Sequence, residues 1–189
     1  MLKKDARKQF RAERMQLSSS QLTRYDDLLL IRFQAIVLPP VSAVLSFWPI
    51  AENHEPNTFP ITDFMQFRIP DLRVCYPVCD PGQGSMRAIL TGEDTVFEEK
   101  THHVQEPVRG EEVEPEQLDL VLVPLLALDQ QGFRVGYGKG YYDRFLARCR
   151  PDCLKMGLSY FEPIPQIEDR DQFDVPLNLC ITPNTTYVF

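Results

Sequence analysis

Apolar residues at the start of the chain recur with helical spacing. Leu2, Ala6 and Phe10 lie four residues apart, and Leu17 continues the same face. This spacing predicts a helix over residues 2–16. Basic residues follow the edge of the apolar face, at Lys3, Arg7, Arg11 and Arg14.

A helix break follows at Ser18-Ser19-Ser20-Gln21. The segment has the capping-box pattern, in which Ser18 caps a helix and Gln21 reaches back. A second helix is therefore expected between this cap and Pro39-Pro40. Its inward positions are Leu22, Tyr25, Leu29, Phe33 and Ile36.

The rest of the chain alternates apolar runs with amphipathic segments. The amphipathic segments predict helices over residues 58–67 and 141–148. The apolar runs predict strands over residues 41–48, 73–78, 86–90, 118–128, 154–160 and 179–182. Run 118–128 is the most apolar and is expected to be a central strand that leads into a loop. This alternation predicts an α/β fold with a mostly parallel sheet.

Length and composition restrict the class of protein. A chain of 189 residues fits a single domain over residues 1–189, and 43% hydrophobic with 25% charged residues is a globular composition. The net charge of −7 argues against a protein that coats nucleic acid, and no apolar run reaches the roughly 20 residues of a membrane helix. We therefore expect a cytoplasmic protein with neither nucleic acid nor membrane as a partner.

Charge is distributed unevenly along the chain. Residues 1–14 hold six basic and two acidic residues, which predicts a basic patch for a small anion. Residues 91–120 hold ten acidic residues against Lys100 and Arg109. The simplest interpretation of this acidic stretch is a solvated loop or surface.

The five cysteines are an odd number, which suits a reducing compartment. Two C-x3-C pairs, Cys75 with Cys79 and Cys149 with Cys153, raise the alternative of a zinc site. Zinc ligands usually have the tighter C-x2-C spacing, so packing in the interior is the favoured interpretation.

The segment with the clearest chemistry is RVGYGKGYYDR, residues 134–144. Its alternating glycines, Gly136, Gly138 and Gly140, permit positive φ and close approach of a ligand, and a helix start follows. The P-loop pattern fails because Phe133 and Gly140 occupy required positions, and the dinucleotide fingerprint fails on glycine spacing. A tight turn is the alternative, but the added charges of Arg134 and Lys139 favour an anion-binding loop.

This segment, with DLVLVPLLALDQQG before it, resembles the signature of the 5-formyltetrahydrofolate cyclo-ligase family. The resemblance extends over the chain through Lys3 to Arg7, Glu55-x-x-Thr58, Glu106-Pro107 and Asp174-Val-Pro. It implies a single three-layer α/β/α domain with a Rossmann-like sheet. It also implies a monomer that converts 5-formyltetrahydrofolate, with or without a polyglutamate tail, to 5,10-methenyltetrahydrofolate with ATP and Mg2+.

The resemblance also implies roles for individual residues. The ATP-binding residues would be Lys3, Lys4, Asp5, Ala6, Arg7, Arg134, Val135, Gly136, Tyr137, Gly138, Lys139, Gly140, Tyr141 and Tyr142. The folate-binding residues would be Ile50, Glu55, Gly138, Lys139, Gly140, Tyr141 and Tyr142. The metal ligands would be Asp143 and Asp174, and the catalytic groups would be Arg134, Lys139 and Tyr142.

Several of these residues have a purely structural alternative. Lys3 and Arg7 would then be a solvated helix face, and Asp143 a first-turn residue that favours the helix dipole. Glu55 would be a loop carboxylate and Asp174 a turn residue before Pro176.

The closing motif departs from the family pattern, which has a His-Asp pair and a later Asp, because this chain has Phe173 and Asn178 at those positions. Two other function classes stay open. One is a non-catalytic nucleotide-binding regulator or RNA-associated module on the same fold. The other is a small-molecule kinase, which would share the phosphate loop but release a phosphorylated product.

Overall fold

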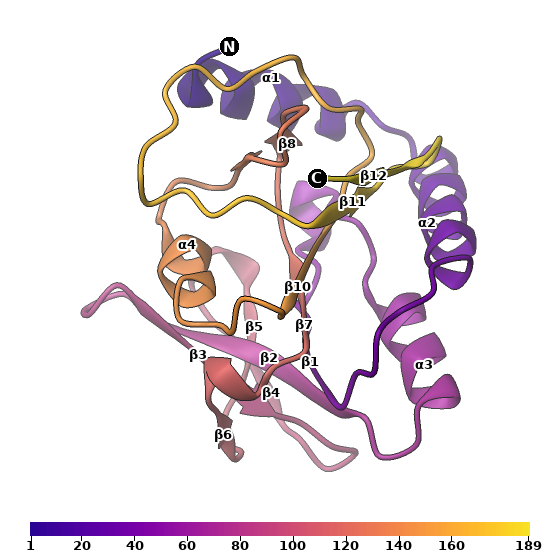
Figure 1. Ribbon diagram of the computed structural model, residues 1–189, viewed down its shortest axis with the longest axis vertical. Helices are drawn as coiled ribbons and strands as arrows, with labels where there is room; N and C mark the ends of the chain where they lie inside the picture. Colours follow the sequence, from indigo (N-terminus) through magenta and orange to yellow (C-terminus); the bar gives the residue numbers. More distant parts are fainter.

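The computed structural model describes residues 1–189 apart from the side chain of His102. An eight-stranded sheet forms its centre (Figure 1). The spatial order is β12 (Thr186–Val188), β11 (Leu179–Ile181), β10 (Leu154–Leu158), β7 (Leu120–Val123), β1 (Ala43–Leu45), β2 (Arg73–Asp80), β3 (Ser85–Leu90) and β6 (Glu112–Val113). Neighbouring strands from β11 to β2 are parallel. At the two edges of the sheet the pairs β11–β12, β2–β3 and β3–β6 are antiparallel. The expected mostly parallel sheet is confirmed.

Helices cover both faces of this sheet, which confirms the three-layer arrangement. Helices α2 (Ser19–Gln34) and α3 (Phe59–Arg68) lie on one side and α4 (Tyr141–Leu146) on the other (Figure 1). Alternate residues of β7 point to the two layers, because Leu120 and Leu122 pack in one core cluster with α2 and α3, whereas Val121 and Val123 pack in another with α4. Across the described part of the chain, no helix combines the length and apolarity needed to span a bilayer.

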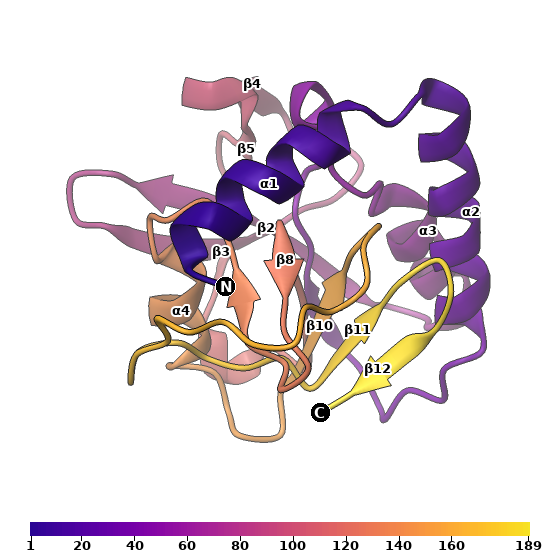
Figure 2. The same ribbon diagram turned by 90° about the horizontal axis from the view of Figure 1, so that it is seen from above.

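The first helix, α1 (Lys3–Met15), lies over one end of the sheet. It crosses a small hairpin of β8 (Ala127–Leu128) and β9 (Arg134–Val135), as Figure 2 shows. Ala6 and Phe10 are buried against Leu126 and Val135 in a third apolar cluster. The predicted apolar face of this helix is thus confirmed.

The capping box of α2 is present as expected, with both reciprocal bonds between Ser18 and Gln21. The helix ends at Gln34, several residues before Pro39. The proline pair therefore does not end the helix. The chain turns away earlier, after the buried Phe33, and the end is closed by a bond from the Ala35 N–H to the Arg32 carbonyl.

Two apolar runs are shorter as strands than expected. Run 41–48 contributes only Ala43–Leu45 to the sheet. Run 118–128 divides at Pro124, which has no N–H to donate to a neighbouring strand. Its first half is β7, and Ala127–Leu128 pairs with β9 outside the main sheet.

The acidic stretch 91–120 is more ordered than a solvated loop. It holds β4 (Phe97–Glu99), β5 (Gln105–Pro107), β6 and two short 3-10 helices, η2 (Thr101–His103) and η3 (Pro115–Gln117). Glu106 is buried and accepts a hydrogen bond from the Cys79 N–H at 2.9 Å. These strands and β12 were not expected, because each is short and has little periodicity.

The C-x3-C residues pack in the interior. Cys75 and Cys79 lie in β2, and all five cysteines are free thiols. Cys75 and Cys153 are buried, and burial raises the pKa of the Cys75 thiol to about 12. The favoured interpretation of these cysteines as core residues is consistent with this placement.

Asp119 ties the start of β1 to β7. Its carboxylate accepts bonds from the backbone N–H groups of Ser42 at 2.7 Å and Ala43 at 3.1 Å. The Arg150 guanidinium donates to the other oxygen at 2.7 Å. Burial alone would raise the pKa of Asp119, but these donors outweigh it and hold the pKa below its ordinary value.

We expect Asp119→Asn to lower the free energy of unfolding by about 1–3 kcal/mol at neutral pH, because charge-assisted hydrogen bonds are lost. Since the folded-state pKa is the lower one, this stabilisation is present above the unfolded pKa of about 3.9 and disappears as pH falls through the folded value. Urea unfolding of both proteins at neutral and acidic pH tests this. The matched control is Asp152→Asn, whose carboxylate is exposed on the same Arg150. A stability difference that does not narrow in acid would contradict the charge-based account.

Candidate active site

The predicted site segments leave the sheet at one place. Strands β1 and β7 are neighbours, while β2 follows on one side and β10 and β11 on the other. The strand order therefore reverses between β1 and β7, and open α/β sheets bind ligands beyond the carboxyl ends of strands at such a point. The chain after β1 leads to Ile50 and Glu55, and the chain after β7 leads through the β8–β9 hairpin to the glycine segment.

The glycine segment has the open backbone that its sequence predicts. Gly138 has φ +93° and Gly140 has φ +69°, in the region that favours glycine. A Cβ at Gly136 would have no heavy atom within 4 Å, and one at Gly138 would lie 3.4 Å from the guanidinium of Arg7. The segment thus forms an open backbone cradle beside a cation, which fits a phosphate group.

The cations of α1 are held at this cradle. Arg7 Nε donates to the Gly136 carbonyl at 2.9 Å, and Lys3 Nζ binds Asp174 at 2.6 Å. The alternative of a solvated face therefore does not describe these two side chains. An open groove of about 300 Å³ lies alongside, lined by Lys4, Arg7, Lys8, Arg11, Leu126 and Tyr137.

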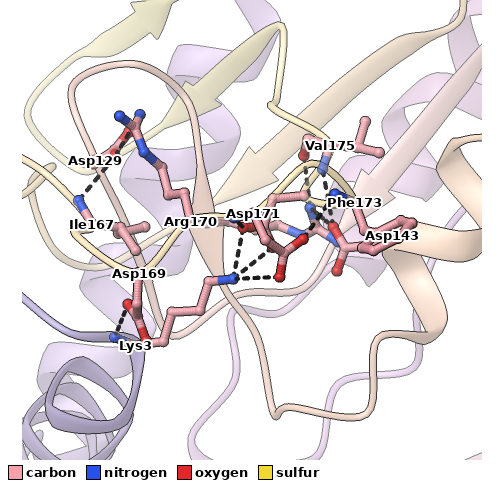
Figure 3. Close-up of polar contacts among 11 residues, drawn as sticks. Lys3, Asp129, Asp143, Ile167, Asp169, Arg170, Asp171, Phe173 and Val175 are labelled. Carbon is pink, nitrogen blue, oxygen red and sulfur yellow. Dashed lines mark hydrogen bonds and ion pairs between the residues drawn. The ribbon is translucent and has the colours of Figure 1, made fainter.

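The two predicted metal ligands are each in an ion pair, and the backbone next to Asp174 bonds to Asp143. Asp143 is 3.0 Å from Arg134 and accepts a bond from the Val175 N–H at 3.2 Å. Asp174 accepts from Lys3 and from the Asp171 N–H at 2.8 Å. Figure 3 shows Asp143, Val175 and Lys3 in this region.

These carboxylates fit Mg2+ that is bound together with phosphate. Among the described residues no group of three or more His, Cys, Asp or Glu side chains could hold a metal ion. Mg2+ does not need such a cage, because it usually binds one or two carboxylates and completes its shell with water and substrate phosphates. Asp143 also lies in the first turn of α4, where a carboxylate interacts favourably with the helix dipole. This structural role and a metal role are compatible.

Glu55 is buried, with 8% of its surface exposed. One carboxylate oxygen accepts the Ile50 N–H at 2.8 Å, and the other accepts the hydroxyl of Tyr137. Burial raises the pKa of Glu55 above its ordinary value, while these bonds and the charge of Arg14 act in the opposite direction. Such an enclosed carboxylate is suited to polar recognition of a ligand ring.

Tyr142 brings a second polar atom into the interior. Its hydroxyl is buried and has no hydrogen-bond partner among the described residues. Burial raises its pKa well above the ordinary value, so the hydroxyl keeps its proton. A buried hydroxyl without a protein partner is available to a ligand atom or a water molecule.

The other predicted residues differ in their exposure. Lys139, Lys4 and Asp5 are exposed, and Tyr141 is half-buried. Ala6 and Val135 are core residues, whereas Lys4, Arg7 and Tyr137 of the predicted ATP-binding segments line the groove. Their assignment to a nucleotide site stays a prediction.

Sequence reasoning missed two groups that support the site. Asp169 Oδ1 accepts the Lys3 N–H at 2.7 Å and caps α1, whose N-cap Leu2 has no polar side chain (Figure 3). Asp129 is fully buried and accepts the Ile167 N–H at 3.0 Å, which ties the β8–β9 hairpin to the segment that caps α1. An aspartate before Gln130-Gln131-Gly132 is a turn signal, but nothing local indicates its distant partner.

Comparisons with known proteins agree on one family. The model of the 5-formyltetrahydrofolate cyclo-ligase family matches residues 2–183. A 5-formyltetrahydrofolate cyclo-ligase of Mycoplasma pneumoniae is 27% identical over 96% of this chain and 98% of its own length. The 5,10-methenyltetrahydrofolate synthetase of Aquifex aeolicus has a TM-score of 0.78 at 27% identity, covering 100% of this chain and 93% of that one. A solved M. pneumoniae 5,10-methenyltetrahydrofolate synthetase gives a TM-score of 0.77 at 25% identity, over 96% and 98% of the two chains.

Proposed function

The chain belongs to the 5-formyltetrahydrofolate cyclo-ligase family, and on this premise we propose that it converts 5-formyltetrahydrofolate to 5,10-methenyltetrahydrofolate. The reaction consumes ATP, requires Mg2+, and releases ADP and phosphate. One observation carries the proposal. The open glycine cradle, the α1 cations and the enclosed Glu55 come together beyond the carboxyl ends of β1 and β7.

The folate ring is recognised at the Glu55 side of the site. The Ile50 N–H and the Tyr137 hydroxyl hold the carboxylate of Glu55, which accepts N–H bonds from the ring. The unpartnered hydroxyl of Tyr142 is available to the same ligand. These contacts orient the formyl group toward the glycine cradle.

The γ-phosphoryl group of ATP passes to the formyl oxygen, which turns a poor leaving group into a good one. Phosphoryl transfer depends on positioning and charge neutralisation more than on a protein nucleophile. Lys3, Arg7, Arg134 and Lys139 with the glycine amides supply that neutralisation. Bound Mg2+, held by Asp143 and Asp174, would add charge at the phosphate oxygens.

Ring closure completes the reaction. The N10 amine attacks the activated formyl carbon, the bond from that carbon to the phosphorylated oxygen breaks, and phosphate leaves with both electrons. N10 loses its proton, which gives the cyclic methenyl product. The protein contributes orientation at this step, because both reacting atoms belong to the substrate.

Two ion pairs at the site support this proposal. Arg134 and Lys3 have 5% and 14% of their side chains exposed, and each is paired with a predicted metal ligand. Phosphate would replace the carboxylates as partner of the two cations, and Asp143 and Asp174 would then be free to hold Mg2+, so every charge would stay paired. This exchange avoids the cost of leaving a buried charge alone.

The direct test is incubation with 5-formyltetrahydrofolate, ATP and Mg2+, followed by the near-ultraviolet absorbance of the methenyl product. We expect product to form only when all three are present, with one ADP released per product. A stable phosphorylated folate would favour a small-molecule kinase. Nucleotide binding without folate turnover would favour a non-catalytic module.

We expect Asp143→Asn to raise the midpoint of the Mg2+ titration of activity several-fold, because the amide removes the charge that a hard cation prefers. The same change leaves the buried Arg134 without its anion, so we also expect a loss of about 1–3 kcal/mol in the free energy of unfolding. The titration, not the melting temperature, therefore tests the metal role.

The matched control is Asp169→Asn, since Asp169 caps α1 through the Lys3 N–H. This variant is expected to lose stability with no change in the titration midpoint. An unshifted midpoint in Asp143→Asn would remove the metal assignment of that residue.

A further inference from the structure

Arg14, in the last turn of α1, is a buried cation that the proposed reaction does not yet use. Only 3% of its surface is exposed. Its hydrogen bonds go to neutral acceptors, from NH1 to the Leu125 carbonyl at 3.3 Å and from NH2 to the Tyr137 hydroxyl at 2.6 Å. Its Nε is buried without a partner among the described residues. A buried charge in neutral surroundings costs free energy, so a compensating anion is expected nearby.

Tyr137 joins Arg14 to such an anion. A guanidinium can only donate, so the Tyr137 oxygen accepts from Arg14 and its single proton goes to Glu55. Burial raises the pKa of Tyr137, so the hydroxyl remains a donor. The two hydrogen bonds therefore point in one direction, from Arg14 through Tyr137 to Glu55.

The Glu55 carboxylate keeps acceptor capacity on both oxygens. Each oxygen has two lone-pair directions and uses one, for the Tyr137 hydroxyl and for the Ile50 N–H. One acceptor direction therefore remains on each oxygen. This pattern matches a ring with two adjacent N–H donors, provided that the carboxylate is ionised and held in this orientation.

We propose that Arg14 is a positioning residue of the folate site, which acts through Tyr137 to orient the Glu55 carboxylate and keep it ionised. This inference rests on the proposed function, because it assumes that Glu55 receives the folate ring. The hydrogen bonds of Arg14 end on Leu125 and Tyr137, so its effect on Glu55 passes through Tyr137.

The other groups that face Glu55 do not supply this charge. Tyr142 on α4 and Tyr160 after β10 are kept neutral by burial, which raises the pKa of each. Tyr160 donates its proton to Asp26 of α2 at 2.7 Å, and the same hydroxyl lies 3.3 Å from the Glu55 carbonyl. The pKa of Asp26 is raised by burial, and any charge on it would disfavour an ionised Glu55. His54 turns its ring to the Arg14 carbonyl, 3.0 Å away, and must be controlled for, because imidazoles change charge between about pH 5 and 8.

The test is binding of 5-formyltetrahydrofolate without ATP, measured by calorimetry over a range of pH. In the wild type we expect affinity to fall in acid as Glu55 gains a proton. In Arg14→Met and Tyr137→Phe we expect affinity at neutral pH to fall by about tenfold or more, since a charge-assisted bond is lost. We expect both variants to raise the pKa of Glu55. The loss of folate affinity on acidification then begins at a higher pH, and affinity is regained at alkaline pH, where Glu55 is ionised. Arg14→Lys keeps the charge and is expected to move the midpoint less.

Three comparisons make the outcome decisive. Arg24→Met removes an exposed charge on α2, away from the groove lining, and a midpoint shift as large as in Arg14→Met would overturn the inference. His54→Gln shows whether the acid fall belongs to the imidazole, and a fall that vanishes in this variant would also overturn it. Tyr137→Phe removes one hydroxyl without emptying the site, so it remains informative if Arg14→Met fails to fold.

Failure of the inference differs from failure of the proposed function. A wild-type protein that does not bind 5-formyltetrahydrofolate at any pH would contradict the proposed function. A wild type that binds it, with variants that lose stability but keep the wild-type midpoint, would show that Arg14 is only structural. In steady-state assays the positioning role predicts that the KM for folate rises by more than kcat falls.

Discussion

Lys139→Ala is expected to lower turnover by about a hundredfold to a thousandfold, the range for loss of a donor aimed at developing charge. Lys139 is exposed between Gly138 and Gly140, so its removal should leave the fold intact. Its side chain is not fixed by an ion pair in the structure as described, which leaves it free to follow the transferring phosphoryl group. Single-turnover rates with saturating ATP measure the effect on the chemical step.

The control for this prediction is Lys100→Ala, which removes an exposed lysine that is paired with Glu98. It is expected to turn over at the wild-type rate, because it lies on the connection between β4 and β5. If Lys139→Ala also kept the wild-type rate, the catalytic charge would have to come from Lys3, Arg7 and Arg134.

Gly138→Val is expected to weaken ATP binding by at least about a hundredfold. The native φ of +93° strains any L side chain, at about 1–3 kcal/mol, and a β-branched one has the fewest rotamers to escape. The new Cβ would lie 3.4 Å from the Arg7 guanidinium, in van der Waals contact, so the γ-methyl groups of valine would crowd that cation and occupy the cradle. Calorimetric titration with a non-hydrolysable ATP analogue measures the loss.

Gly92→Val is the matched control, since a Cβ at Gly92 has no heavy atom within 4 Å and its φ is not in the glycine region. This variant is expected to bind the nucleotide as the wild type does. Equal affinity in Gly138→Val would show that the segment is a turn and not a phosphate cradle.

Residues near one another in sequence decided much of what could be predicted. The spacing of Leu2, Ala6 and Phe10 located α1, and the Ser18 capping box located the start of α2. Both depend on contacts within one or two helical turns. The positive φ of Gly138 and Gly140 is likewise a local property of glycine.

Strand lengths were less predictable. A buried segment is apolar whether or not it pairs with a strand of the sheet, so an apolar run does not show where a strand ends. Run 118–128 is buried throughout its second half, but Pro124 and the turn at Asp129 take Ala127–Leu128 out of the main sheet. The partner β9 begins with Arg134, a residue that sequence alone placed in a ligand loop. Pairing between strands depends on distant segments, so no local pattern reveals it.

The sequence by itself determined the longer helices and most strands of the main sheet, and that a glycine segment with cations follows a strand. The tertiary structure decided which charges enter the interior. Spacing placed Arg14 in the same stripe as Lys3, Arg7 and Arg11, yet Arg14 is buried against Leu125 and Tyr137 while Arg11 stays exposed. The reason is that periodicity gives only the direction of a side chain around its helix. Whether that direction faces water or the Tyr137–Glu55 pair depends on the loops that the carboxyl ends of β1 and β7 bring beneath α1.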